Sequence, residues 1–433
     1  MRHWTRHCAR ASATLVLWAA CARPGTTPPP SSTPAPAHTE PELRIGVAAE
    51  RPNVAIGGDG ELILTDDRTG EPIGSIPAGA HWIAVPDGSV LRLVRPDGSM
   101  TDAHAGVFAV NVTQDRFAMA DGHMFRGRLD IVRQPAVAAE SGGAVGNGIL
   151  IVNRVPLESY VASVIAVEMG PRKMNEREAL LAQAIVTRTR ALQSRGRWEA
   201  QGVDAFADVR DQVYGGVASE TEQSWEAARA TSGLVLTYEG QLIDAYFHST
   251  CGYSTVPVQE AFKTAVARPY LRSVSDAREY GGYFSDVSPR FQWREEWDGA
   301  SLRSILSTTL APYMNVGAAG LPRITNIQVT GTTRSGRVSE LRIAFDQGEV
   351  RIPGPDVRNV LRPTPDRMLG SAMFQLDVKI EGGEVTHLVA TGVGWGHGVG
   401  FCQWGAIGRA RAGADAARIL AAYFPGTKIE RLY

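Results

Sequence analysis

The hydrophobic periodicity of the chain changes near residue 148, and this change constrains the fold more than any other feature. Before it, between residues 42 and 147, short apolar runs alternate with polar residues, a pattern that predicts β-strands. Three Asp-Gly pairs interrupt these runs and predict hairpin turns: Asp59-Gly60, Asp87-Gly88 and Asp97-Gly98. After a small-residue linker at 138–148, a strand over 148–155 leads into helical periodicity. We therefore expect a β-rich N-terminal module at 42–147 in front of a second domain at 148–433.

The second domain combines helices with further strands. A helix is expected over 299–313, and strands are expected at 324–331, 338–345, 349–354, 374–380 and 387–392. Because helices and antiparallel strands are mixed without regular strand–helix alternation, the sequence predicts an α+β fold. Trp82 in the first module suits either a glycan-binding role or ordinary use in a core or at a scattered surface position, and the second is more common for a single tryptophan.

The N-terminus has the layout of a secretory signal. Arg2, Arg6 and Arg10 precede an apolar run at 13–20, and small residues stand directly before Cys21. The segment 1–21 therefore resembles a lipoprotein signal cut before Cys21, which would receive a lipid; in the alternative, an ordinary signal is removed and Cys21 is incidental. Residues 22–41 are rich in Pro and Thr and contain no Val, Ile, Leu or aromatic side chain, so they predict an extended tether. We expect a membrane-anchored lipoprotein of the cell envelope, on the periplasmic or extracytoplasmic side.

Composition narrows the class of partner. With 433 residues, 44% hydrophobic and 21% charged, the chain is long and apolar enough to form packed domains. Its formal net charge of -1 provides no electrostatic reason to expect nucleic acid as a partner.

A helix ending near Gly170-Pro171 presents a single carboxylate, Glu168. Pro156 suits the first helical position, and one apolar face is formed by Leu157, Val161, Val164 and Val167. Apolar neighbours and the negative end of the helix dipole both disfavour an ionised Glu168, so its pKa should be raised, as a general acid requires. The alternative is an ordinary solvated residue at a helix end.

A longer helix follows over 175–197, with Asn175 as its cap. Its expected apolar face is Leu180, Leu181, Ala184, Ile185 and Leu192. Gln183 and Arg188 then lie on neighbouring faces, where they could bind a sugar or orient Glu168, or simply be solvated.

Five motifs occur in the order typical of the stage II sporulation protein D and LytB (SpoIID/LytB) family: VPLESYVASVIAVEM, LLAQAIVTRTRAL, DQVYGGVASE, HSTCG and GWGHGVGFCQWGA. The chain resembles this family over roughly 148–433. The resemblance implies a SpoIID-like catalytic domain and a peptidoglycan lytic transglycosylase that cleaves glycan strands between MurNAc and GlcNAc, with Glu168 as the catalytic acid. It also implies substrate-binding roles for Gln183, Arg188, Gln212, Tyr214, His248, Ser249, His397, Gln403 and Trp404. Lytic cleavage requires one carboxyl group, which agrees with the absence of a Glu/Asp pair around Glu168.

The sequence departs from the family at two places. Leu181 stands where many members have a lysine, and the segment before Gln212 lacks the cysteines implicated in a zinc site of other members. We therefore expect no metal and no cofactor. Cys251 and Cys402 are cysteines in two motifs expected at one cleft, and in an oxidising envelope they are expected to form a disulfide; the alternative is two independent buried thiols.

Two other functions stay open. The LytB name implies a non-catalytic peptidoglycan-binding protein or amidase enhancer, whose partners would be glycan strands and a cell-wall amidase. The other is an envelope scaffold that binds protein partners. In every case the membrane would be reached through the N-terminal lipid.

Overall fold

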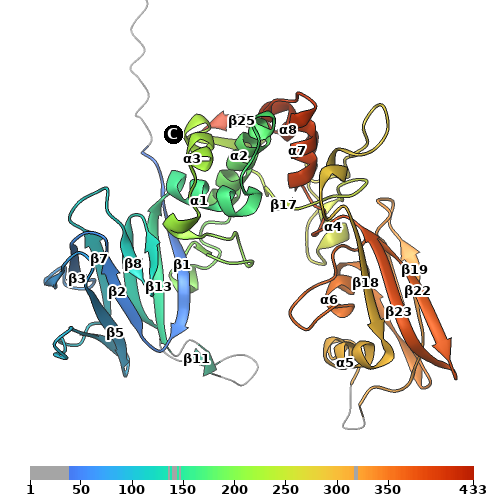
Figure 1. The fold of residues 1–433 in the computed structure, drawn as a ribbon, viewed down its shortest axis with the longest axis horizontal. Helices are drawn as coiled ribbons and strands as arrows, with labels where there is room; N and C mark the ends of the chain where they lie inside the picture. The colour runs from blue at the N-terminus through green and yellow to red at the C-terminus, as the bar shows by residue number, and fades with distance from the viewer. Residues whose placement is uncertain (1–38, 135–136, 139–143, 146–147, 316–319) are drawn as a thin grey trace, which may run out of the picture. The chain divides into compact units, whose positions relative to one another are not determined.

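The computed structural model describes residues 39–134, 137–138, 144–145, 148–315 and 320–433 (Figure 1). The predicted signal at 1–21, the lipid attachment at Cys21 and the tether up to residue 38 lie outside the described residues. Within the described ranges, no helix has both the length and the apolar character needed to cross a membrane.

Two antiparallel sheets form the N-terminal part of the described chain. In spatial order the first contains β14 (Ala205–Phe206), β1 (Glu42–Arg51), β13 (Gly148–Pro156), β10 (Arg128–Gln134), β7 (Gly106–Asn111), β3 (Leu62–Asp66) and β4 (Pro72–Ile76), of which only β14 pairs in parallel. The second contains β6 (Val90–Val94), β5 (His81–Asp87), β2 (Val54–Gly58), β8 (Ala118–Ala120) and β9 (His123–Phe125). Alternate residues of both sheets, such as Leu62 and Leu64 in β3 and Ile56 in β2, enter one common hydrophobic core. The expected β-rich region is therefore present.

The structure shows whether Trp82 is buried and which strands two of the Asp-Gly pairs connect. Trp82 is only 7% exposed and belongs to this core, with the Arg95 guanidinium 5.0 Å from its ring centroid, so the core alternative holds. Asp87-Gly88 joins the paired strands β5 and β6, as predicted. Asp59-Gly60 instead connects β2 to β3, which belong to different sheets, because each strand finds its partners elsewhere in the chain.

Strand β13 lies on the predicted domain boundary. It begins at Gly148, where the second domain was expected to start, yet it pairs with β1 on one side and β10 on the other. The preceding linker contains the short paired strands β11 (Val137–Ala138) and β12 (Ala144–Val145). The division at 147/148 stays a prediction, and β13 is hydrogen-bonded into the sheet of the N-terminal module.

Helix α1 (Leu157–Met169) follows β13 directly and is buried over most of its length. Leu157, Val161 and Val164 are inaccessible, as expected, and Tyr160 and Ile165 on other faces are also inaccessible. The cause is that α1 packs against α2 (Arg177–Gln193), α3 (Glu222–Ala230) and β13 at once. Val167 was predicted on the apolar face but is 41% exposed, since the last turn of α1 emerges from this packing.

Helix α2 begins later than predicted. A short 3-10 turn at Met174–Glu176 precedes it, and Asn175 does not act as its cap. The helix ends at Gln193 rather than 197, and a turn follows. On its other sides lie α7 (Gln403–Arg411) and α8 (Ala416–Tyr423), from the opposite end of the chain (Figure 1). This packing brings the two motif regions of the sequence together.

Two three-stranded sheets form a second hydrophobic core between residues 292 and 393. One sheet contains, in spatial order, β18 (Gln292–Asp298), β23 (Glu384–Val393) and β22 (Phe374–Glu381). The other contains β19 (Ile324–Thr332), β20 (Val338–Phe345) and β21 (Gly348–Pro353). The helices α5 (Gly299–Thr309) and α6 (Val357–Val360) contact these strands. The five predicted strands are present, while β18 was missed because its apolar positions are limited to Trp293 and Trp297. The α+β fold class is confirmed.

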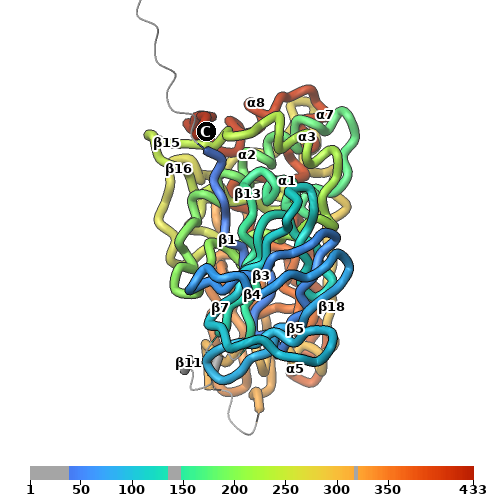
Figure 2. The backbone as a smooth tube through the Cα atoms, turned by 90° about the vertical axis from the view of Figure 1, so that its left-hand side faces the viewer, coloured from blue at the N-terminus to red at the C-terminus, as the bar shows by residue number. Residues whose placement is uncertain are grey.

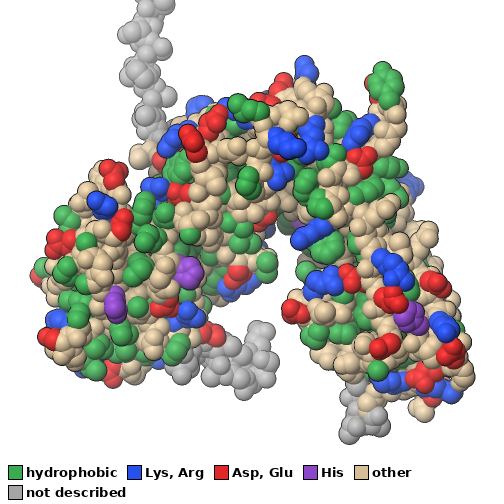
Figure 3. Space-filling view, in the orientation of Figure 1, with side chains coloured by type: hydrophobic (Ala, Val, Ile, Leu, Met, Phe, Trp, Pro, Cys, Tyr) green, Lys and Arg blue, Asp and Glu red, His purple; other side chains and the backbone are tan. Residues whose placement is uncertain are grey.

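Short pairings connect distant segments near the motifs. Strand β17 (Phe247–His248) pairs in parallel with β24 (Phe401–Cys402), so His248 lies opposite Cys402. Near the C-terminus, β25 (Lys428–Arg431) pairs with β15 (Leu234–Tyr238), which also pairs with β16 (Gln241–Leu242). Figure 2 shows the C-terminus beside β15. Acidic and basic side chains are interspersed over the face in Figure 3, in agreement with a net charge near zero.

Candidate functional site

Glu168 lies where two cavities meet. It occupies the last turn of α1, and its Oε2 accepts a hydrogen bond from Nε2 of Gln403, the first residue of α7, at 3.2 Å. The two cavities have volumes of about 970 and 630 Å³, and Glu168, Val209, Val213 and Phe247 line both. Glu168 therefore stands at the middle of a continuous site with space on two sides.

The environment of Glu168 favours its protonated form. Burial raises the pKa of this carboxyl group above its usual value near 4.5, while the hydrogen bonds from Gln403 and from the backbone of Val213 act in the opposite direction. Among the ion pairs of the described residues, none includes Glu168. Burial without a cationic partner favours the protonated form of this carboxyl group, which is the form that a general acid needs.

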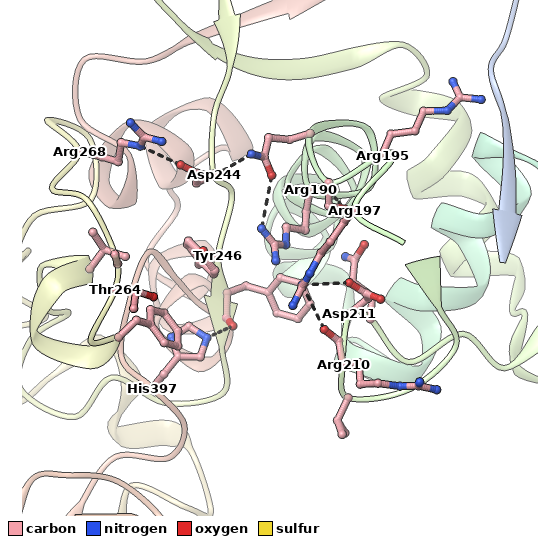
Figure 4. A pocket seen from close by; sticks show the side chains of 18 of the residues that line it. Arg190, Arg195, Arg197, Arg210, Asp211, Asp244, Tyr246, Thr264, Arg268 and His397 are labelled. Atoms are coloured by element: carbon pink, nitrogen blue, oxygen red, sulfur yellow. Dashed lines mark hydrogen bonds and ion pairs between the residues drawn. The ribbon is translucent and has the colours of Figure 1, made fainter. Parts of the chain in front are cut away.

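The other carboxylates of the larger cavity accept hydrogen bonds from arginines and other donors (Figure 4). Asp211 accepts from Trp198 Nε1 at 2.8 Å and from Arg197 Nη1 at 3.3 Å. Asp244 accepts from Gln193 Nε2 at 2.7 Å and from Arg268 Nε at 2.9 Å. Of the carboxylates that line either cavity, Glu168 alone has no guanidinium partner within the described residues. The site thus offers one available acid rather than a pair.

The smaller cavity has an aromatic and basic wall. Trp404 and Trp395 both line it, with the guanidinium of Arg172 5.4 Å from the ring centroid of Trp404 and that of Arg290 4.8 Å from Trp395. Ser249 lines the same space. Such flat apolar faces bordered by donors suit a sugar ring, which presents both C–H faces and hydroxyl groups.

His397 lines the larger cavity, but both of its nitrogens bind backbone atoms. Nε2 donates to Phe247 O at 2.8 Å, and Nδ1 accepts from Val399 N at 3.0 Å. Burial, with a contribution from the charge of Arg358, lowers the pKa of His397 to about 3. His397 is therefore neutral, and it shapes its glycine-rich loop and contributes its ring to the cavity wall. In that loop a Cβ at Gly398 would lie 2.4 Å from the Arg337 guanidinium, and φ is +84°.

Three residues expected to bind substrate lie outside both cavities. Arg188 is inaccessible and binds Glu158 through two hydrogen bonds, Nε to Oε1 at 2.9 Å and Nη2 to Oε2 at 2.5 Å. Gln183 is also inaccessible and donates to Thr187 Oγ1 at 3.2 Å. The hydroxyl of Tyr214 donates to Asn153 at 2.8 Å. The expectation that Gln183 and Arg188 reach a sugar or orient Glu168 is corrected, because tertiary packing covers every face of α2 at these positions.

Gln212 is placed differently. It lines the larger cavity, its Oε1 accepts from the Tyr160 hydroxyl at 3.2 Å, and its Nε2 has no hydrogen-bond partner in the part of the chain that the structure describes. It is therefore a candidate donor to a ligand.

Several lining residues were missed by the sequence reasoning. Arg190 lines the larger cavity and lies 4.7 Å over the Tyr246 ring, two residues after the buried Arg188 in the same motif. Arg172 and Trp395 line the smaller one. The helical phase of α2 separates Arg188 from Arg190 by about 200°, and the sequence did not show which of the two faces the cleft.

The structure also places Leu181, which departs from the family pattern, and the two cysteines. Leu181 borders a small separate cavity beside Arg177 and neither of the cavities that contain Glu168. Cys251 and Cys402 are adjacent and fully buried, but they are free thiols in the structure, and the expected disulfide is not formed. The backbone N–H of Cys251 donates to Cys402 Sγ at 3.1 Å, so the two are not independent either.

The fold and the site together define an α+β protein whose cleft presents one desolvated glutamate. Residues 145–238 match the family described as "Stage II sporulation protein" (SpoIID), and residues 277–400 match a domain of unknown function (DUF8618). The chain is 31% identical to the stage II sporulation protein D of Bacillus subtilis, over 64% of this chain and 75% of that protein. It is 30% identical to an uncharacterized protein of Brachyspira hyodysenteriae, over 65% and 68%. An amidase enhancer of Bacillus subtilis is 27% identical over 58% of this chain and 38% of its own length. The chain belongs to the SpoIID family.

Proposed function

We propose that this protein is a lytic transglycosylase that cleaves peptidoglycan glycan strands between MurNAc and GlcNAc, with Glu168 as the catalytic residue. The observation that supports this most directly is the position of Glu168, half-buried, without a cationic partner and open to two cavities. Membership in the SpoIID family, which includes lytic transglycosylases, supports the same reaction.

The reaction uses one carboxyl group twice. Protonated Glu168 donates its proton to the glycosidic oxygen as the bond from that oxygen to the MurNAc anomeric carbon breaks. The resulting carboxylate then takes the proton of the MurNAc 6-hydroxyl while O6 bonds to the anomeric carbon, which closes a 1,6-anhydro ring and returns the proton to Glu168. No water is consumed, so a second carboxylate to activate water is not needed. Asp211 and Asp244 are both bound to arginines, which agrees with a mechanism that uses Glu168 alone.

The two cavities suit the two sides of the cleaved bond. A strand with its scissile bond at Glu168 would place sugars against Trp395 and Trp404 on one side, and against Gln212 and Arg190 on the other. Gln403 would act on Glu168 itself, because its amide holds the carboxyl group in one orientation at 3.2 Å.

A non-catalytic amidase enhancer is the second candidate, favoured by the name of one relative. In that case the same cleft would hold a glycan strand without cutting it, and the partner would be a cell-wall amidase. The two candidates differ in whether the purified protein releases anhydro-sugar fragments.

The test is incubation of purified sacculi with the protein, followed by mass analysis of the soluble fragments. We expect 1,6-anhydroMurNAc ends from the wild type and a loss of several orders of magnitude in Glu168→Gln, whose amide cannot donate the proton. Glu222→Gln, on the exposed surface of α3, is the matched control and should cleave normally. Cleavage by Glu168→Gln at the wild-type rate would remove Glu168 from the mechanism. Absence of cleavage by the wild type, together with stimulation of an amidase, would favour the second candidate.

Location and domain roles follow the same proposal. We propose that Cys21 carries a lipid, that residues 22–41 tether the protein within the cell envelope, and that the module at 42–147 positions the domain at 148–433. The shared strand β13 supports a fixed connection between the last two, since it pairs with strands of the module and continues directly into α1.

A further inference from the structure

We propose that His248, Cys251 and Cys402 form a binding site for a zinc ion or another soft divalent metal. This site is separate from the segment before Gln212, where the sequence excluded a cysteine-based site. The proposal concerns the structure of the cleft wall and does not depend on the proposed reaction.

The three potential ligand atoms already lie close together. One nitrogen of His248 and the sulfurs of Cys251 and Cys402 all lie within 4.8 Å of one another. Tetrahedral zinc with bonds of about 2.3 Å to sulfur and 2.0–2.1 Å to nitrogen separates neighbouring ligand atoms by about 3.5–3.8 Å. The parallel pairing of β17 with β24 places His248 opposite Cys402, and Cys251 follows three residues later in the same turn. The fold therefore brings the ligands together without large movement.

The tautomer of His248 suits a metal ligand. Its Nδ1 lies 3.1 Å from Val399 O, and a carbonyl oxygen only accepts, so Nδ1 bears the hydrogen and Nε2 has a free lone pair. The residue is 4% exposed, and Nε2 has no hydrogen-bond partner in the described part of the chain. A buried polar atom without a partner is costly, and a metal ion would satisfy it.

The sulfur of Cys402 lies beside two backbone N–H groups. Its sulfur accepts backbone N–H bonds from Cys251 at 3.1 Å and from Gly405 at 3.2 Å, and the residue caps the N-terminus of α7. Both features would stabilise this sulfur once it is bound to a metal ion. The Arg337 guanidinium donates to Cys251 O at 3.2 Å and adds positive charge beside the pair.

One of the three proposed ligands borders the smaller cavity. Three protein ligands leave the fourth tetrahedral position to water. His248 lines the smaller cavity next to Ser249, so the proposed site lies at the wall of the cleft. A bound metal would hold the HSTCG turn to the start of α7, where Gln403 contacts Glu168. The metal would thus fix the position of Gln403 beside Glu168.

The experiment measures metal content and thiol state in the same full-length preparation. The protein is purified in reduced form, loaded with zinc, dialysed, and analysed by mass spectrometry for bound metal; loading with Co²⁺ reports thiolate ligation through its charge-transfer absorption. We expect about one ion per chain and cobalt–sulfur absorption in the wild type, and affinity lowered at least about tenfold in His248→Ala and Cys402→Ser. His387→Ala is the control for loss of a histidine, since His387 is paired with Glu296 away from the site, and it should bind normally.

Two further measurements make the outcomes decisive. His248→Gln is a second variant in case His248→Ala does not fold, which circular dichroism will show. Thiol labelling after denaturation with a chelator and without reductant should modify both cysteines of protein isolated from the envelope. A disulfide in that protein, equal metal content in wild type and His248→Gln, or cobalt binding without sulfur absorption would each overturn the proposal.

Discussion

Removal of Arg188 should lower the free energy of unfolding rather than weaken substrate binding. The family resemblance assigned this arginine to the substrate, whereas the structure buries it completely against Glu158. Its guanidinium also donates to Leu234 O at 3.0 Å, and Glu158 accepts from Gly233 N at 3.2 Å and from the Tyr433 hydroxyl. The pair therefore joins α1, α2 and the C-terminus.

The magnitude follows from what the substitution leaves behind. In Arg188→Ala, the Glu158 carboxylate stays buried without a cation, and Leu234 O loses a donor. Breaking a buried ion pair from one side costs about 3–5 kcal/mol of the free energy of unfolding. Arg177→Ala removes an arginine from the same helix whose partner Glu226 is exposed, so its cost should be within about 1 kcal/mol. The double variant Arg188→Met/Glu158→Leu should recover much of the loss, because no charge stays buried.

Urea unfolding followed by circular dichroism will measure these differences, and glycan cleavage will be measured under conditions where each variant is folded. We expect Arg188→Ala to have a lower unfolding midpoint and a KM close to that of the wild type. A variant as stable as Arg177→Ala but with a strongly raised KM would refute the structural role and restore Arg188 to the substrate.

Three other predictions concern the acid, its neighbour and the anchor. The hydrogen bond from Gln403 lowers the pKa of Glu168, so Gln403→Leu should raise that pKa. Because the acid must be protonated to act, the alkaline limb of the pH–rate profile should move to higher pH. An unmoved limb would show that Gln403 does not act on the Glu168 carboxyl group. Because the pKa of Glu168 is raised on folding, its stabilising contribution is complete below about pH 4.3, the unfolded value, and is lost as pH rises toward the folded pKa. Glu168→Gln should therefore melt at a higher temperature than the wild type at pH 7 and at the same temperature near pH 4, and equal melting at both would show that burial does not shift this group. Cys21→Ser should release the protein from the membrane fraction into the soluble envelope fraction, and unchanged fractionation with an unmodified wild-type Cys21 would count against the lipid.

His397 was expected at the cleft as a substrate-binding residue, and the structure shows that its ring nitrogens are bound to backbone atoms. The motif placed it at the cleft, and it does line the larger cavity. Its two nitrogens are used by Phe247 and Val399, one from a distant strand and one from its own loop. Long-range backbone hydrogen bonds of this kind have no local signature in a sequence.

The sequence alone determined the α+β class, the start of α1 to within a residue and the strands after residue 324. These features depend on local periodicity, turn residues and motif order, which can be recognised in the sequence itself. Only the tertiary structure decided that Arg188 is buried and Arg190 is not, and that β13 belongs to the sheet of the N-terminal module. It also decided that the two cysteines are free thiols and that His248 lies beside them. Each of these depends on which faces are covered by segments distant in sequence, and packing between such segments is set by the fold as a whole.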